Sequence, residues 1–158
     1  MDEVTQQAAL LRIPYGLHVV GARRGEDPHA FTVTWLSQCS FDPPRLMMAV
    51  RVGSEGHARI VSESVFAVSF LHRGQEKVAK AFFKRCVAAT GTLNGFAYRR
   101  GETGCPILLD APAFVECRVA EILAGGDHAV VVGEVIAAGA EGEEPPLTLA
   151  QTGWSYRA

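Results

Sequence analysis

The sequence AFTVTWLSQCSFDPP, residues 30–44, decides the fold. Apolar and polar residues alternate from Phe31 to Trp35, which is the pattern of a strand with one buried face. The alternation breaks at Leu36, so we expect the chain to bend or loop there. Two adjacent prolines follow, and proline cannot donate to a β-ladder, so this corner is predicted to lie at the edge of a sheet or barrel.

Strand patterns continue on both sides of this segment, in consecutive runs rather than alternating with long helices. Strands are predicted at residues 17–23, 30–39, 45–52, 65–71, 114–123 and 128–138, with a turn-rich linker at 24–28 and a glycine-rich hairpin turn at 124–127. Residues 86–112 are expected to be irregular, 141–146 to form an exposed acidic loop, and 147–156 to be extended. Six or seven strands in this arrangement favour an antiparallel barrel over a doubly wound sheet.

Two or three short helices complete the expected fold. Residues 2–12 carry apolar side chains at helical spacing and acids in the first turn. A second helix is expected at about residues 57–63, with Ala58 and Val61 packed inward. A third is expected at 75–83, and its predicted apolar side is Val78, Ala79, Phe82 and Phe83.

Size and charge narrow the class of protein. The 158 residues fit one domain, here 1–158, and the 48% apolar and 20% charged fractions are those of a globular protein. A net charge of −2 with mixed signs argues against a nucleic-acid partner. The sequence has neither a signal-peptide pattern nor an apolar run long enough for a membrane span, so we expect a soluble, cytoplasmic protein.

The four cysteines match no zinc or redox motif, and reduced thiols are expected. Cys39 and Cys117 lie in strand patterns, where a cysteine usually behaves as a small buried hydrophobe. His18, His29 and His72 have no acid or cysteine at ligand spacing, so no metal site is predicted.

Four segments together resemble the flavin reductase-like, FMN-binding split-barrel family. They are residues 30–44; 66–71 followed by Gln75 and the helix at 79–82; 114–119 followed by Gly126-Asp127-His128 and 133–135; and the ending 153–156. Each is weak alone, but they occur in the family's order and spacing. The resemblance implies a mainly β, Greek-key split barrel that forms a homodimer, with FMN or FAD in a groove at the subunit interface.

The resemblance also implies cofactor-binding residues. The strand and loop would contribute Thr32, Thr34, Trp35, Leu36, Ser37, Gln38, Cys39 and Ser40, and other segments would contribute Ser54, Gly56, His57, Phe83, Lys84 and Trp154. Hydroxyls and backbone amides suit the polar edge and the phosphate of a flavin. The alternative is that these polar residues are only the exposed face of a strand, and that Trp35 packs in the core.

The expected phosphate site departs from the family pattern. Backbone amides at a helix start favour an anion, and Ser54 and His57 match the family, but Glu55 stands where the family commonly has arginine and Gly56 where it has threonine. A carboxylate there would repel a phosphate unless it points to solvent or the phosphate is held elsewhere. Lys84 is the expected compensating cation, although it could also be an ordinary helix-end lysine.

His128 is the candidate catalytic residue, because the family's histidine at this position lies near the nicotinamide and flavin. Its alternative role is that of a turn residue. The leading functional hypothesis is hydride transfer from NADH or NADPH to flavin, with a monooxygenase or another acceptor as possible partner. The alternatives are a tight FMN-binding electron carrier of the flavoredoxin-like branch, without a nicotinamide site, and a relative that has lost flavin.

Overall fold

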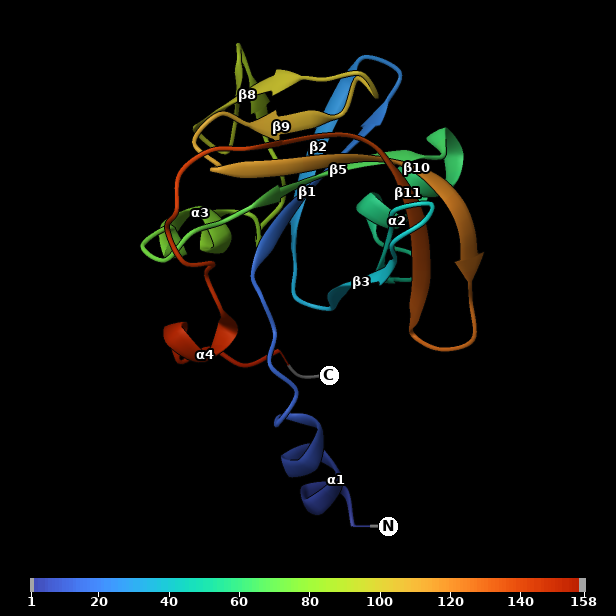
Figure 1. The fold of residues 1–158 in the computed structure, drawn as a ribbon, viewed down its shortest axis with the longest axis vertical. Coiled ribbons are helices and arrows are strands. Elements are labelled where there is room, and N and C mark those ends of the chain that lie inside the picture. Colours follow the sequence, from blue (N-terminus) through green and yellow to red (C-terminus); the bar gives the residue numbers. More distant parts are fainter. Residues whose placement is uncertain (1, 157–158) are drawn as a thin grey trace.

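A seven-stranded antiparallel sheet forms the body of the molecule in a computed structural model that describes residues 2–156 (Figure 1). Its strand order is β2-β1-β5-β10-β11-β4-β3. The strands are β1 (His18–Arg24), β2 (Asp27–Val33), β3 (Leu36–Ser40), β4 (Arg45–Arg51), β5 (Val65–Phe70), β10 (Ala113–Leu123) and β11 (His128–Ala140). β2 and β3 lie at opposite edges of this sheet although only Thr34 and Trp35 separate them in the chain. The sheet must therefore curl until its two edges meet at these two residues.

The break between β2 and β3 differs slightly from the prediction. One strand was expected over residues 30–39 with a bend at Leu36, whereas the chain leaves the ladder at Thr34 and re-enters a strand at Leu36. Because β3 is an edge strand, its Cys39 is exposed, and the expectation that Cys39 is buried was wrong; Cys117 is buried. The turn at residues 41–44 follows β3 directly, which confirms that the paired prolines lie at a sheet edge.

A second, four-stranded sheet occupies the segment that was expected to be irregular. It consists of β6 (Ala88–Ala89), β7 (Thr92–Leu93), β8 (Phe96–Arg100) and β9 (Pro106–Leu108). These strands are too short for an alternation to be visible in the sequence. Gly91 and Gly95 adopt positive φ in the tight turns between them, a conformation that glycine accepts without steric cost.

The core has two main layers, one on each face of β1. Val19 belongs to a cluster with Leu71 and Phe82, and the next residue, Val20, belongs to a cluster with Phe66. Successive side chains of a strand point to opposite faces, so β1 is buried continuously from His18 to Ala22 instead of on alternate residues.

The structure has four helices within residues 2–156, one more than the largest number expected: α1 (Glu3–Leu10), α2 (Glu55–Glu63), α3 (Glu76–Ala81) and α4 (Leu149–Thr152). α4 lies in the segment expected to be extended, and a Thr148–Gln151 capping box begins it. None of these helices is long and apolar enough to cross a membrane.

The predicted inner face of α2 was wrong. Ala58 and Val61 are exposed, and the helix buries Gly56, Arg59 and Ile60 instead. A buried arginine was not expected on this face, but ion pairs with Asp27 and Glu55 satisfy the Arg59 guanidinium. On α3, Val78, Ala79 and Phe82 are buried as expected, whereas Phe83 is 55% exposed because the helix ends at Ala81.

Candidate functional site

A pocket of about 750 Å³ lies where the two edges of the curled sheet meet. Its wall is formed by all of β2, the Thr34–Trp35 break, the end of β4, the start of α2, the segment after α3 and the first residue of β11. Its lining includes Asp27, Phe31, Thr32, Thr34, Trp35, Arg51, Ser54, Glu55, Gly56, Arg59, Phe83, Lys84, Arg85, Cys86, His128 and Tyr156. Its volume lies within the range of cofactor and ligand sites.

An aromatic cluster of Trp35, His128 and Tyr156 forms part of the wall. The ring centroid of Trp35 lies 4.8 Å from that of His128 and 5.3 Å from that of Tyr156. The Trp35 indole N–H is buried and has no hydrogen-bond partner within residues 2–156. A buried donor without a partner is costly, so this N–H is a donor in the pocket wall that the protein itself leaves unsatisfied.

His128 is the middle member of a hydrogen-bonded chain. Its Nδ1 lies 3.0 Å from Oδ1 of Asp127, and its Nε2 lies 2.9 Å from the hydroxyl oxygen of Tyr156. The hydrogen bond from His128 lowers the pKa of Asp127 below its usual range, so Asp127 is a carboxylate at neutral pH and can only accept. Neutral His128 therefore carries its proton on Nδ1, and Nε2 accepts the phenol proton.

The start of α2 forms a different part of the wall. Ser54 caps the helix, its Oγ accepting the backbone N–H of His57 at 3.2 Å, and unpaired amides of the first turn favour an anion. Gly56 is required here, since a Cβ at this position would lie 2.3 Å from a ring carbon of Phe31. The packing of Phe31 therefore explains why residue 56 of this chain is glycine where the family commonly has threonine.

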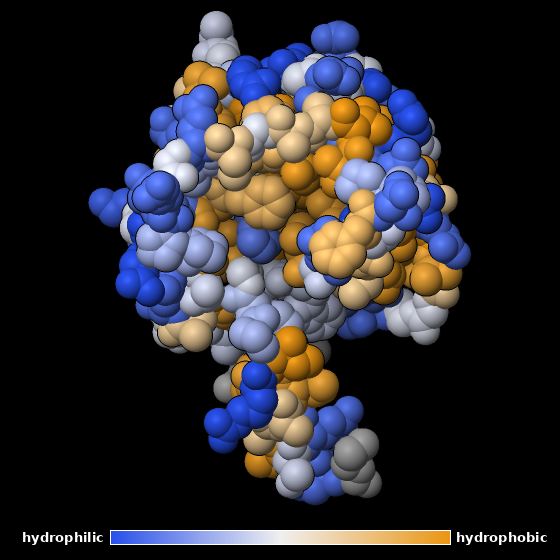
Figure 2. Space-filling view, viewed as in Figure 1, coloured by the Kyte–Doolittle hydropathy of each residue, from blue (hydrophilic) through white to orange (hydrophobic). Residues whose placement is uncertain are grey.

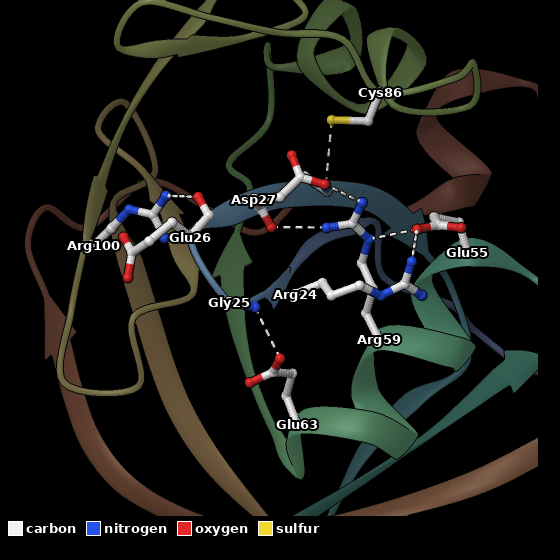
Figure 3. Close-up of polar contacts among 10 residues, drawn as sticks. Arg24, Gly25, Glu26, Asp27, Glu55, Arg59, Glu63, Cys86 and Arg100 are labelled. Carbon is white, nitrogen blue, oxygen red and sulfur yellow. Dashed lines mark hydrogen bonds and ion pairs between the residues drawn. The ribbon is translucent and has the colours of Figure 1, made fainter.

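Arg59 resolves the conflict expected from Glu55 (Figure 3). Its Nε donates to Oε1 of Glu55 at 2.7 Å, and its two terminal nitrogens donate to Oδ2 and the backbone carbonyl of Asp27 at 2.6 and 2.7 Å. Arg24 adds a contact of 3.6 Å to the same Glu55 oxygen. The hydrogen bond from Arg59 is the main cause of a lowered Glu55 pKa. Glu55 is thus ionised, but its charge is paired with Arg59 and Arg24 of the same chain.

Further cations and hydroxyl groups line the pocket. Arg51, Lys84 and Arg85 belong to the same lining as Arg59. The Thr32 hydroxyl donates to the Ala79 carbonyl at 2.7 Å, which leaves it an acceptor. The Ser54 hydroxyl accepts from His57 and keeps its proton for donation.

The structure brings eight of the fifteen predicted site residues to this pocket: Thr32, Thr34, Trp35, Ser54, Gly56, Phe83, Lys84 and His128. The other seven lie outside its lining. Leu36, Ser37, Gln38, Cys39 and Ser40 form the edge strand β3, His57 lies on α2, and Trp154 packs edge-on against Phe83 at 5.3 Å.

Several polar and aromatic residues of the lining were not predicted, among them Arg51, Arg59 and Tyr156. The motif Gly153–Tyr156 could have indicated Tyr156, because it matched the family at the end of the chain. Nothing in the sequence distinguished Arg59, which occupies an ordinary helical position, from a solvated charge.

Comparison with known proteins identifies the family. The model of the family described as flavin reductase-like domain matches residues 10–156. The chain belongs to this family. It is 34% identical over 148 residues to the reductase component of 4-hydroxyphenylacetate 3-monooxygenase from Thermus thermophilus, which covers 92% of this chain and 91% of that protein.

The fold of this flavin reductase-like chain is the family's split barrel. The NADH:FAD oxidoreductase of Streptomyces globisporus, solved in complex with NAD and FAD fragments, superposes with a TM-score of 0.79 at 29% identity, covering 93% of this chain and 87% of that one. Another relative, diflavin flavoprotein A 1 of Synechocystis, is 32% identical over 130 residues. This chain covers only 23% of that protein's length, so it corresponds to one part of it.

A flavin is compatible with the residues present. The aromatic cluster, with the unpaired Trp35 N–H, suits the isoalloxazine ring, and the α2 start, with Ser54 and nearby cations, suits a phosphate. The pairing of Glu55 by Arg59 removes the main electrostatic objection.

Proposed function

We propose that this protein is an NAD(P)H-dependent flavin reductase that acts on FMN or FAD in the pocket between β2, β4 and α2. The observation that carries the proposal is the presence, in one pocket, of an aromatic cluster containing His128 and a helix start surrounded by cations. Relatives named as a probable flavin reductase and as an NADH-dependent FAD reductase, and a neighbouring structure with NAD and FAD fragments, support it. When bound, the flavin would accept hydride from the nicotinamide.

The residues of this chain would act by binding, orientation and exclusion of water. Trp35 would border the flavin ring and donate its indole N–H, and the amides at the start of α2 would hold the phosphate together with Lys84 or Arg51. Phe83 would cover the apolar part of the ligand. Alignment of two reacting rings is the main contribution a protein makes to hydride transfer between cofactors.

Steady-state turnover tests this proposal. Purified protein is mixed with FMN or FAD and with NADH or NADPH, and the decrease of the nicotinamide absorbance band is followed. We expect flavin-dependent oxidation of at least one of the two nicotinamides. No turnover in any of the four combinations would rule the proposal out. Firm retention of FMN without reduction would indicate an electron carrier.

We also propose that the protein works as a homodimer that supplies reduced flavin to a separate acceptor such as a monooxygenase. Helix α1 projects away from the body and contributes no buried residue (Figures 1 and 2). Val4 is 75% exposed, and Leu10, Leu11 and Ile13 are at least two-fifths exposed. Leaving this much apolar surface in water is unfavourable, and a second copy of the chain could cover it.

A further inference from the structure

The hydrogen-bonded chain from Asp127 through His128 to Tyr156 indicates which of its residues can contact a ligand. The sequence resemblance implied that this residue is His128, but the geometry favours Tyr156. Both residues line the pocket. The His128 side chain is only 13% exposed, and both of its ring nitrogens already have partners. Tyr156 is 44% exposed, and its hydroxyl has donated its one proton to His128. Of the two members of this hydrogen-bonded chain that line the pocket, Tyr156 is therefore the more accessible to a ligand.

The direction of the hydrogen bonds fixes what the phenol oxygen of Tyr156 can do. Asp127 only accepts, so the His128 proton lies on Nδ1, Nε2 accepts, and the Tyr156 hydroxyl donates. Its oxygen keeps lone pairs for an incoming N–H donor. The ring of Tyr156 is also held edge-on to Trp35, with an interplanar angle of 85°. Two contacts, to His128 and to Trp35, thus orient a residue near the end of the chain.

We propose that Tyr156 is the residue that binds the nicotinamide end of NAD(P)H, by accepting a hydrogen bond from its primary carboxamide, and that His128 is a positioning residue that acts through Tyr156. This inference rests on the proposed flavin reductase function. A primary carboxamide has N–H groups that can donate a hydrogen bond to the phenol oxygen. Asp127 and His128 make that oxygen a better acceptor because they hold its proton on the opposite side.

Binding of NAD⁺ and of ADP-ribose to wild type and to Tyr156→Phe tests the proposal. The variant keeps the ring against Trp35 and removes only the oxygen. ADP-ribose lacks the nicotinamide and serves as the internal control. We expect Tyr156→Phe to weaken NAD⁺ binding about three- to tenfold, the size of one hydrogen bond, with unchanged affinity for ADP-ribose and FMN. In turnover, KM for the nicotinamide should rise by a similar factor while kcat changes less than about twofold.

Tyr98→Phe is the matched control, because Tyr98 lies on β8 outside the pocket lining, and it should change none of these quantities. Unchanged NAD⁺ affinity in Tyr156→Phe, or an equal loss for NAD⁺ and ADP-ribose, would overturn the inference. The wild type could show no turnover while its NAD⁺ affinity still falls in Tyr156→Phe. That result would overturn the proposed function but support this inference. A wild type that does not bind NAD⁺ would overturn both.

Discussion

At the scale of single residues, His18 shows how burial makes a fold sensitive to acid. Its imidazole packs edge-on against Phe70 at 5.2 Å, and its Nδ1 is buried without a partner among residues 2–156. Burial lowers the pKa of His18 from 6.5 to about 4. The folded state therefore holds His18 neutral, whereas the unfolded chain binds a proton already near pH 6.5.

We predict that stability falls between pH 6.5 and pH 4 because of His18. Since the unfolded state binds more protons in this window, the free energy of unfolding decreases as pH falls, by about 2 kcal/mol from this residue between pH 8 and pH 5. Urea unfolding at pH 8 and at pH 5 measures this. Between the two pH values, the free energy of unfolding of His18→Leu should fall by about 2 kcal/mol less than that of the wild type. His72→Gln, at a partly exposed histidine, should follow the wild-type curve.

Glu116 is a second buried group with a structural role. It is 2% exposed and accepts hydrogen bonds from the amides of Glu102 and Thr103, at 3.0 and 2.8 Å, and from the Thr103 hydroxyl at 2.6 Å. Its carboxylate thereby fastens the loop between β8 and β9 to β10.

We predict that Glu116→Gln lowers the free energy of unfolding by about 2 kcal/mol, because an amide replaces a carboxylate that accepts three hydrogen bonds. Denaturant unfolding measures this directly. Glu121→Gln, at an exposed position on the same strand, should change it by less than about 0.5 kcal/mol. Equal effects of the two substitutions would show that the buried contacts contribute little.

At the scale of elements, the anion site proposed at the start of α2 depends on the ion pair between Arg59 and Glu55. We predict that Arg59→Gln weakens FMN binding at least about tenfold, because the Glu55 charge is then opposed only by Arg24 beside the phosphate. Riboflavin, which lacks the phosphate, should bind nearly as before. The double variant Glu55→Gln/Arg59→Gln should recover most of the FMN affinity.

Fluorescence titration of each variant with FMN and riboflavin gives the four affinities needed for this cycle. Equal losses for FMN and riboflavin in Arg59→Gln would mean that Arg59 only maintains the shape of α2. Failure of the double variant to recover FMN affinity would have the same meaning.

Strands and helices with long patterns could be predicted from the sequence, and short or exceptional ones could not. β10 and β11 are long strands joined by a glycine-rich turn, so the strand pattern and the turn residues both predicted this hairpin. β6 and β7 have two residues each, which is too short for any periodicity. The inner face of α2 was missed because Arg59 is buried by partners on other segments, and a sequence pattern does not show which charges will be paired.

The same distinction applies to the candidate site. Thr32, Thr34 and Trp35 could be predicted because they lie where the sheet closes, and the family motif marks that place. The residues of β3 were included because the resemblance implies a flavin-binding loop there, with a bend at Leu36. The chain instead breaks at Thr34–Trp35 and Leu36 begins an edge strand, so Leu36–Ser40 lie outside the pocket lining, and only the three-dimensional strand order reveals this.

At the scale of the whole molecule, the exposed apolar side chains in and after α1 lead us to predict a homodimer. The protein should sediment with about twice its chain mass of 17.0 kDa at micromolar concentration. Leu10→Asp should weaken dimerisation at least about tenfold if a partner buries that side chain. Leu109→Asp, an exposed leucine after β9, should not. Analytical ultracentrifugation distinguishes these outcomes, and a monomeric wild type would contradict the dimer.

The most direct test of the account is the crystal structure of this protein with FMN. We expect the isoalloxazine ring beside Trp35 and the phosphate at the start of α2 near Ser54, with Glu55 still paired to Arg59. FMN bound in another part of the molecule, or a pocket that stays empty at saturating FMN, would contradict it.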